Sequence, residues 1–285
     1  MARNAPSLRW RKKPPANRTP EQIVNHYLVE KGIADRLRRA DREERKKIFG
    51  WMYDELFAKV PDHPRLTGVR DPASLAAHNR SKLSLVEPFV GPSTVFVEFA
   101  PGDCTFAYLV CERVRQVIGV DISNQAADAV AIPDNFTLHV FDGYRLDLAN
   151  DSADVVFSDQ FIEHLHPDDV DHHFRLARAV LKPGGSYIFR TPHAFHGPFD
   201  ISEYFSEVPQ GFHLKEWTFT ELGGHLRAQG FSSLHGGRRR RGRYRELPFG
   251  LFTGYEHLIG RLPHRARALA ARAMLPRHIY VRAVK

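Results

Sequence analysis

The stretch from Val95 to Asp121 constrains the fold more than any other part of the sequence. A β-rich run at 95–99 is followed by a turn at 100–102, an apolar helix-like run and a second β-rich run at 117–121. Each of the two β runs carries an acid at or near its end. This order is typical of one half of a nucleotide-binding α/β unit.

Further strands follow at regular spacing. The pattern predicts strands at 136–141, 153–158 and 185–190, a sixth near 231–235 and a last one at 279–284, with helices between them. Such alternation implies a parallel sheet with helices on both faces. We therefore expect an α/β fold with a Rossmann-like, mainly parallel sheet.

The flanking segments differ from this core. Residues 1–18 are rich in Arg, Lys and Pro and lack acids, so they predict a basic flexible arm. Helix start signals at Thr19, Asp41 and Asp71 predict three helices before the first strand. The expected organisation is a basic arm at 1–18, an N-terminal helical cap at 19–90, a core at 91–235 and 278–285, and a basic loop with a helical insert at 236–277.

Composition limits the setting and the partners. The chain has 285 residues and a net charge of +8, so an anionic partner is electrostatically plausible. Cys104 and Cys111 are the two cysteines, and no Cys/His cluster has zinc-ligand spacing, which fits a reducing compartment. No uncharged apolar run approaches the ~18 residues of a membrane span. We expect a cytoplasmic protein without a transmembrane segment.

The loop after the first strand indicates the kind of ligand. The turn at Ala100, Pro101 and Gly102 allows close approach of a ligand to the backbone, and Asp121 can accept hydrogen bonds from ribose hydroxyls. A dinucleotide site would require a G-x-G-x-x-G loop, which this chain lacks. Glu98 and Asp103 would repel a pyrophosphate but suit an amine and a sulfonium. The pattern favours S-adenosylmethionine over NAD.

These residues resemble the class I S-adenosylmethionine-dependent methyltransferases, and the likeness continues to about Pro192. Glu98 matches the acid of the family's first motif. Ala100, Gly102 and Cys104 stand at its three glycine positions, of which only the central glycine is kept. The resemblance implies a seven-stranded sheet whose last strand is inserted antiparallel. It also implies that the chain is an enzyme with S-adenosylmethionine as its cofactor.

The family's other motifs occur in order. Asp121 matches the ribose-binding acid, and Asp142 with Gly143 matches the segment whose acid meets the adenine amino group. Residues 153–165 look like the fourth strand and the turn that follows it, and residues 181–185 look like the turn before strand five. The resemblance implies these cofactor-binding residues: Glu98, Ala100, Pro101, Gly102, Asp121, Ile122, Asp142, Gly143, Asp159 and Gln160.

Histidines gather after strands four and five, where an acceptor would meet the cofactor. An alcohol acceptor must lose its proton, and histidine is the usual base near neutral pH. The catalytic candidates are His164, His193 and His213. His193 directly follows the fifth strand and is the best-placed base, whereas His164 is expected to shape the pocket and His213 lies in a segment that could fold back as a lid. We predict no metal site.

The acceptor can be narrowed by a second resemblance. Segments 43–64, 191–200 and 211–218 are similar to bacterial methyltransferases associated with polysaccharide and O-antigen assembly. This likeness implies O-methylation of a sugar or glycan hydroxyl, with Trp217, Phe195 and Phe212 able to stack on sugar faces.

Three alternatives remain open at this point. The arginines between Arg238 and Arg245 could bind RNA, which would make the protein an RNA methyltransferase, although an exposed loop explains them as well. The altered glycine loop would also fit a degenerate, non-catalytic partner protein. Apolar and basic residues at 249–275 would suit peripheral contact with a membrane surface or a helical cap on the sheet.

Overall fold

An eight-stranded sheet forms the centre of the computed structural model, which describes residues 8–67, 71–126, 131–240 and 243–285. The strand order is β3-β2-β1-β4-β5-β8-β6-β7. The strands are β1 (Val95–Phe99), β2 (Gln116–Asp121), β3 (Phe136–Val140), β4 (Ala153–Asp159), β5 (Leu181–Pro192), β6 (Ser233–Arg240), β7 (Arg243–Pro248) and β8 (His278–Val284).

The pairing confirms a Rossmann-like α/β sheet but changes the expected strand count. Strands β1 to β5 are parallel to their neighbours, and β8 is antiparallel between β5 and β6. The antiparallel insertion of the last strand agrees with the sequence expectation. The eighth strand, β7, pairs antiparallel with β6 and was not expected. Because β1 to β5 run the same way, their carboxyl ends meet at one edge.

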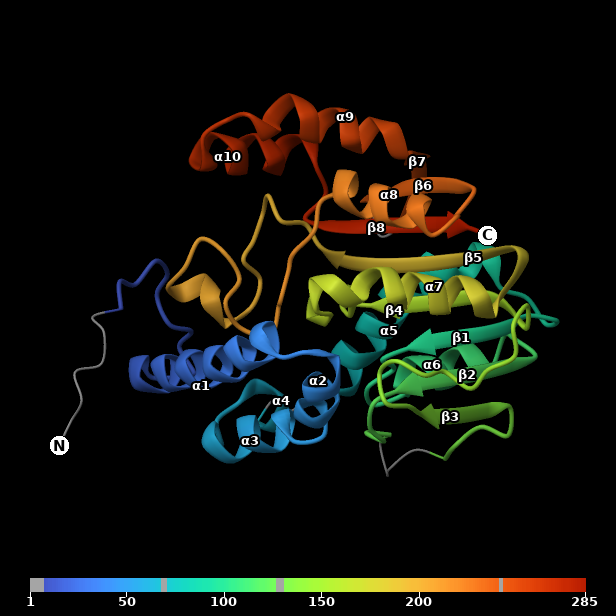
Figure 1. Cartoon of the computed structure of the whole chain (residues 1–285), viewed down its shortest axis with the longest axis horizontal. Coiled ribbons are helices and arrows are strands. Elements are labelled where there is room, and N and C mark those ends of the chain that lie inside the picture. Colours follow the sequence, from blue (N-terminus) through green and yellow to red (C-terminus); the bar gives the residue numbers. More distant parts are fainter. Residues whose placement is uncertain (1–7, 68–70, 127–130, 241–242) are drawn as a thin grey trace.

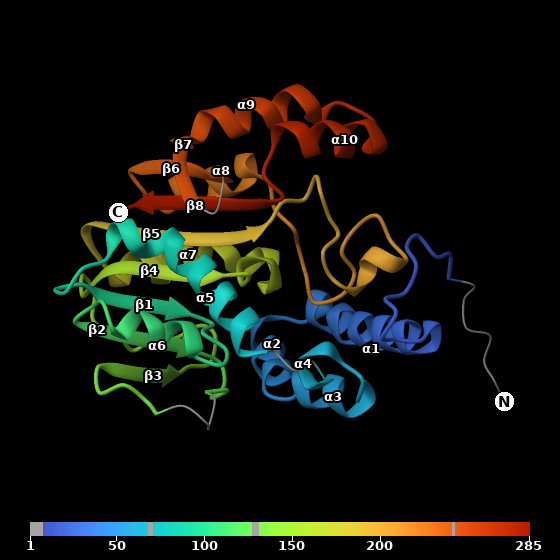
Figure 2. The ribbon, with the colours of Figure 1, turned by 180° about the vertical axis from the view of Figure 1, so that it is seen from behind.

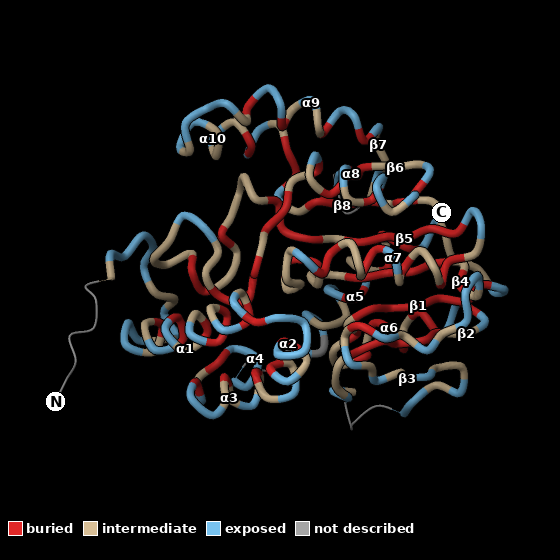
Figure 3. The backbone as a smooth tube through the Cα atoms, viewed as in Figure 1, coloured by how far each residue is buried: buried red, intermediate tan, exposed pale blue. Residues whose placement is uncertain are grey.

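Helices cover both faces of the sheet, as Figures 1 and 2 show from opposite sides. Phe174 and Leu226 pack in the core on one face, and Leu83 and Phe106 pack on the other. The central strands β1, β2, β4, β5 and β8 are buried along most of their length, whereas the outer strands β3, β6 and β7 are more exposed (Figure 3). The helices are α1 (Pro20–Arg39), α2 (Arg42–Phe49), α3 (Met52–Lys59), α4 (Pro64–Thr67), α5 (Pro72–Val86), α6 (Thr105–Cys111), α7 (Val170–Val180), α8 (Phe219–Ala228), α9 (Phe249–Gly260) and α10 (His264–Met274).

Helices α1 to α4 lie beyond the carboxyl ends of the parallel strands (Figure 1). Helix α1 begins at the expected capping box, in which Thr19 and Gln22 exchange hydrogen bonds. Ile33 and Leu56 then pack with Phe212, which comes from the segment between β5 and α8. The N-terminal helices therefore share a core with a distant segment and cover the edge where a ligand would bind.

The N-terminal segment also makes contacts where it is described. The backbone N–H of Arg11 donates to the carbonyl of Tyr204 at 2.8 Å, and the ring of Trp10 packs on Phe205. Arg18 forms an ion pair of 2.6 Å with Asp62. Residues 1–7 of the predicted flexible arm lie outside the described residues.

The prediction of an exposed loop at 236–245 was wrong for the residues that the structure describes. Gly236–Arg240 and Arg243–Arg245 are paired strands, while residues 241 and 242 lie outside the described ranges. The glycine pair at 236 and 237 explains the difference, because the rings of Phe252 and Tyr244 fill the space that side chains would take there. Arginines at 238, 239 and 245 thus stand on a hairpin at the edge of the sheet.

The expected helical insert before the last strand is present as α9 and α10. Phe249 and Phe252 of α9 are buried against α8 and the sheet. Leu258 and Leu269 point to solvent. Within the described ranges, no helix combines the length and the apolar character that crossing a bilayer requires.

The hairpin gives a stability prediction. A methyl group at position 236 would lie 2.4 Å from the buried ring of Phe252, so we expect Gly236→Ala to lower the free energy of unfolding by about 1–3 kcal/mol. Gly224→Ala is the matched control, since position 224 in α8 is exposed and open and alanine favours a helix by about 0.5–1 kcal/mol. Urea unfolding of both variants measures this, and equal stability of the two would contradict the packing described.

Candidate active site

The loop after β1 keeps the path of a glycine loop although Gly102 is the one glycine at the family's three glycine positions. Ala100, Gly102 and Cys104 have φ values of 54°, 58° and 58°. A left-handed conformation costs a non-glycine residue about 1 kcal/mol, so Ala100 and Cys104 hold these values only because the surroundings impose them. The N–H of Ala100 donates to the carbonyl of Val120 at 2.8 Å, which ties the loop to β2.

Two acids face this loop from the strand ends. Glu98 is 1% exposed, and its Oε2 has no hydrogen-bond partner. Burial raises the pKa of Glu98 to about 7, against the opposing charge of Lys82. Burial also raises the pKa of Asp121, although the N–H groups of Ser123 and Gly102 donate to its carboxylate. Both carboxylates therefore lie where a bound cation would be favoured.

The segment after β3 lies against the N-terminal helices. Lys46 of α2 is 3.1 Å from Oδ2 of Asp142. A Cβ at Gly143 would stand 3.3 Å from the ring of Phe49 and 3.9 Å from Ile122. The structure thus brings Ile122, Asp142 and Gly143 together beneath α2, next to Asp121.

The segment after β4 contains a strongly paired acid. Asp159 accepts two hydrogen bonds from Arg190, at 2.5 and 2.6 Å, and lies 3.6 Å from Lys82. Gln160 has a φ of 54°, and its buried Nε2 has no partner. The donor at Gln160 and the acceptor at Glu98 are both left for a ligand, because unpaired buried polar groups are costly. This set fits a ligand with a cationic amine and sulfonium and with acceptor atoms.

A second group of titratable residues lies next to these. Glu163, His164 and His213, which we name the Glu163 cluster, each offer one nitrogen or oxygen atom within 4.8 Å of the others. Glu163 is fully buried; its Oε2 accepts a hydrogen bond from Thr191 at 2.9 Å, and its Oε1 has no partner. The two rings keep some exposed surface. The structure thus brings two of the three predicted histidines together.

The pKa values in the cluster follow from burial and charge. Burial raises the pKa of Glu163 to about 7 and lowers that of His164 to about 3, with the charge of His213 acting in the same direction on His164. Burial alone would lower the pKa of His213, but the hydrogen bond to Glu216 and the charges of Glu163 and Asp200 raise it to about 9.

His193 lies elsewhere. Its side chain is 0% exposed, its Nδ1 accepts the N–H of Phe195, and its Nε2 is 3.0 Å from Oε1 of Glu256 in α9. Glu256 also accepts two backbone N–H groups at the start of α8. The ring of His193 therefore contacts the α8 and α9 side of the sheet and is not part of the Glu163 cluster.

Two of the aromatic residues expected to stack on a sugar are inaccessible. Trp217 is 0% exposed and belongs to the main core. Phe212 is buried against Tyr53 of α3. The stacking expectation is wrong for both residues, because each side chain fills a hydrophobic core.

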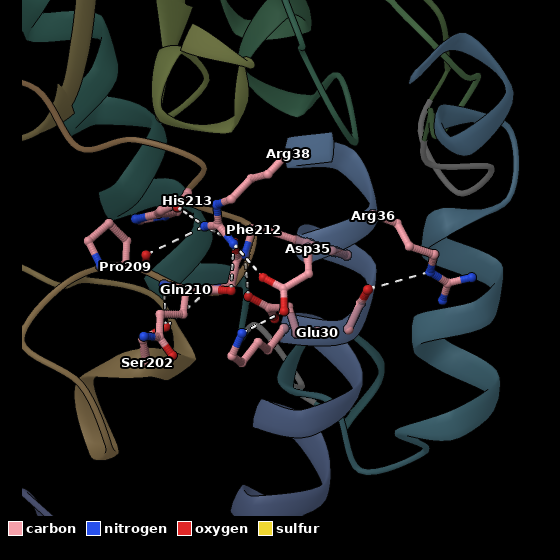
Figure 4. Close-up of polar contacts among 12 residues, drawn as sticks. Glu30, Asp35, Arg36, Arg38, Ser202, Pro209, Gln210, Phe212 and His213 are labelled. Atoms are coloured by element: carbon pink, nitrogen blue, oxygen red, sulfur yellow. Dashed lines mark hydrogen bonds and ion pairs between the residues drawn. The ribbon is translucent and has the colours of Figure 1, made fainter. Parts of the chain in front are cut away.

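Side chains of helix α1 hold the backbone of the segment that carries His213 (Figure 4). The guanidinium of Arg38 donates to the carbonyls of Gln210, Gly211 and His213 at 3.0, 3.2 and 3.2 Å. Oε1 of Glu30 accepts the N–H of Phe212 at 2.8 Å. These contacts fix the segment that carries His213 over the sheet edge.

Several residues around the site were missed by sequence reasoning. Lys82, Lys46, Arg38 and Glu30 all belong to the N-terminal helices, whereas their partners lie far along the chain. The charged residues of an amphipathic helix usually face solvent. These four residues differ from solvent-facing charged residues only because their helices pack near the sheet edge, and the sequence does not show this packing.

The buried acid in β1 predicts how stability depends on pH. The folded pKa of Glu98 is raised from 4.5 to about 7, so the stabilisation of the protonated form is complete below pH 4.5 and is lost as pH rises through about 7. We expect Glu98→Gln to remove this loss, so that without ligand the variant gains up to about 3 kcal/mol relative to wild type between pH 5 and pH 8. Thermal unfolding across this range measures the stability of both proteins. A stability difference that does not change with pH would contradict a buried carboxyl group with a raised pKa.

Comparison with known protein families matches one part of the chain. A family described as "Methyltransferase domain" matches residues 97–189, the span from β1 to β5. No curated protein matches the chain.

Solved structures show the same fold at low identity. One is a chain of the complex between the Haloferax volcanii Trm112 methyltransferase activator and a putative methyltransferase, with 18% identity over 78% of this chain and 96% of that chain and a TM-score of 0.53. Another is phosphoethanolamine N-methyltransferase 1 of Haemonchus contortus with phosphoethanolamine and S-adenosylhomocysteine, with 14% identity over 86% of this chain and 50% of that chain and a TM-score of 0.56. A third is an S-adenosylmethionine-dependent methyltransferase from Archaeoglobus fulgidus, with 18% identity over 75% of this chain and 100% of that chain and a TM-score of 0.50.

The matched span runs from β1 into β5 and contains the loops after β1, β2, β3 and β4. Residues 97–189 are thus a methyltransferase domain, and the solved structures show that it has the same fold as the methyltransferases compared with it.

Proposed function

We propose that the protein methylates a hydroxyl group of a sugar or glycan. The observation that carries this proposal is the Glu163 cluster, three converging acid and imidazole groups at the carboxyl edge of the sheet. The cluster is close to the cofactor side, since the charge of Asp159 acts on Glu163. A polar group of side chains of this kind suits an acceptor rich in hydroxyl groups.

The cofactor would be held by the residues around the β1 loop. When bound, S-adenosylmethionine supplies its sulfonium methyl group to the acceptor. Asp121 would accept the ribose hydroxyls, Asp142 the adenine amino group and Glu98 the methionine amine. Lys82 would meet the methionine carboxylate. The bound cofactor would also contact these residues: Ala100, Pro101, Gly102, Ile122, Gly143, Asp159 and Gln160.

The Glu163 cluster would orient the acceptor and assist the loss of its hydroxyl proton. The Nδ1 atoms of His164 and His213 are each held by an acceptor, the carbonyl of Phe212 at 3.0 Å and Glu216 at 2.8 Å. Each ring therefore directs its Nε2 atom away from these partners. Within the cluster, these atoms and Glu163 would align the hydroxyl oxygen with the methyl group. His193 lies outside the Glu163 cluster, and its Nε2 is near Glu256 but makes no hydrogen bond, so we give this residue a structural role.

An RNA acceptor is the second candidate, and fewer observations support it than support a sugar acceptor. Arg238, Arg239 and Arg245 lie on the hairpin at the β7 edge, whereas the Glu163 cluster follows β4. Arg239 donates to Ser81, and the neighbouring Glu246 pairs with Arg282. RNA bound at this edge would have to extend past β6, β8 and β5 to reach the Glu163 cluster.

Cofactor binding can be tested at Asp121. We expect Asp121→Ala to weaken S-adenosylmethionine binding at least tenfold, because the ribose hydroxyls would lose their charged acceptor. Asp134→Ala, an exposed acid before β3, is the control and should leave the affinity unchanged. Calorimetry measures both, and equal affinity of the two variants would remove Asp121 from the cofactor site.

The acceptor can be tested with labelled cofactor. Incubation with oligosaccharides, small phenols and RNA should place the label on oligosaccharides as base-stable methyl ethers. His213→Gln should reduce turnover at least a hundredfold with cofactor affinity within threefold, whereas His193→Gln should lower stability and keep turnover within a few-fold. Labelling of RNA alone, or loss of turnover only in His193→Gln, would overturn the proposal.

A further inference from the structure

Among the described residues, two groups of side chains have atoms close enough to share a metal ion. One is His26, Glu30 and His63 in the N-terminal helices, and the other is the Glu163 cluster. Distance alone does not separate the two groups. Their hydrogen-bond partners do, because a histidine nitrogen can bind a metal only through a free lone pair.

The first group is occupied by hydrogen bonds. Arg18 lies 3.0 Å from Nδ1 of His26, and a guanidinium only donates, so this Nδ1 is the acceptor. The hydrogen of the neutral ring is then on Nε2, which is 2.9 Å from Glu30 and donates to it. The other oxygen of Glu30 accepts the N–H of Phe212. His26 thus presents a hydrogen where a metal would need a lone pair.

The Glu163 cluster has the opposite arrangement. Nδ1 of His164 is 3.0 Å from the carbonyl of Phe212, which can only accept, so the hydrogen is on Nδ1. Nδ1 of His213 is 2.8 Å from Oε1 of Glu216 and donates to this carboxylate. In His164 the lone pair is then on Nε2, and His213 offers one on its Nε2 once the second ring proton is released to solvent as the metal ion binds. Histidines that bind metals almost always donate their other ring N–H to a carbonyl or carboxylate in this way.

The carboxylate of the cluster provides an independent observation. Glu163 is 0% exposed, Thr191 holds its Oε2, and its Oε1 has no partner. A buried oxygen without a partner is costly unless a ligand supplies one. Glu216 and Asp200 place further carboxylates around His213, so the surroundings favour a cation.

We propose that the Glu163 cluster binds one divalent transition-metal ion through Nε2 of His164, Nε2 of His213 and a carboxylate oxygen of Glu163. Two imidazoles and one carboxylate suit Zn²⁺ and similar ions better than Mg²⁺, which prefers oxygen ligands and bound water. Three protein ligands leave a coordination position open. The role of this position rests on the proposed function: a hydroxyl oxygen there would lose its proton to solvent more readily and then accept the methyl group, which leaves the sulfonium as S-adenosylhomocysteine.

Metal binding can be measured without cofactor or acceptor. The full-length protein is treated with a chelator, dialysed and titrated with Co²⁺, whose visible absorption reports coordination by nitrogen ligands. We expect one Co²⁺ per chain, displaced by Zn²⁺ and not by Mg²⁺. The absence of binding at millimolar Co²⁺ would overturn the proposal for the wild-type protein, with no variant required.

Variants assign the ligands. His164→Gln and Glu163→Gln should each weaken Co²⁺ binding at least a hundredfold, and Glu216→Gln should weaken it about tenfold, because His213 would lose the carboxylate that orients it. His63→Gln, from the other group, is the control and should bind Co²⁺ like wild type. Circular dichroism checks that each variant is folded. Loss of binding in His63→Gln, or its retention in folded Glu163→Gln, would contradict the assignment.

The outcome also separates this proposal from the proposed function. Co²⁺ bound as expected together with labelling of RNA or phenols would remove the sugar acceptor and leave the metal site in place. Methylation of oligosaccharides by protein that binds no Co²⁺ would remove the metal site and leave the proposed function in place.

Discussion

Burial of carboxylates at the carboxyl edge of the parallel sheet is the constraint on which the site depends. Parallel pairing places the ends of β1, β2 and β4 together, and with them Glu98, Asp121, Asp159 and Glu163. Removing such groups from water is expensive unless cations or donors compensate. Asp159 is compensated by Arg190 and Lys82, whereas Glu98 and Glu163 each retain an oxygen without a partner. The edge is therefore short of positive charge, which a sulfonium, an amine or a metal ion would supply.

The N-terminal helices complete this edge and do not merely cover it. Arg38 holds the backbone that carries His213, and Lys46 reaches the acid that follows β3. Phe212 packs with α1 and α3 while its carbonyl accepts from His164, so one residue joins the helical core to the Glu163 cluster. The helical cap and the Glu163 cluster are therefore structurally coupled. A substitution that displaces α1 would therefore shift His213 more directly than the loop after β1.

The sequence could predict features that depend on local pattern. The strand near 95–99 and the acid at Asp121 follow from periodicity and from a motif whose members are close in the chain, and the antiparallel last strand follows from the family resemblance. It could not predict that Arg238 would be in a strand, since this depends on rings packing over two glycines. From the sequence, His193 ranked ahead of His213 because it directly follows β5, but tertiary packing turns His193 toward Glu256 and His213 toward Glu163, which no local pattern shows.

The central claim is that the edge around Glu98 and Asp121 receives S-adenosylmethionine beside the Glu163 cluster. A crystal structure with S-adenosylhomocysteine tests it most directly. We expect the ribose hydroxyls within hydrogen-bond distance of Asp121, the methionine amine near Glu98, and the loop at 100–104 with its left-handed residues unchanged. The sulfur should face the Glu163 cluster. A ligand bound elsewhere, or a sulfur directed away from Glu163, His164 and His213, would contradict the account.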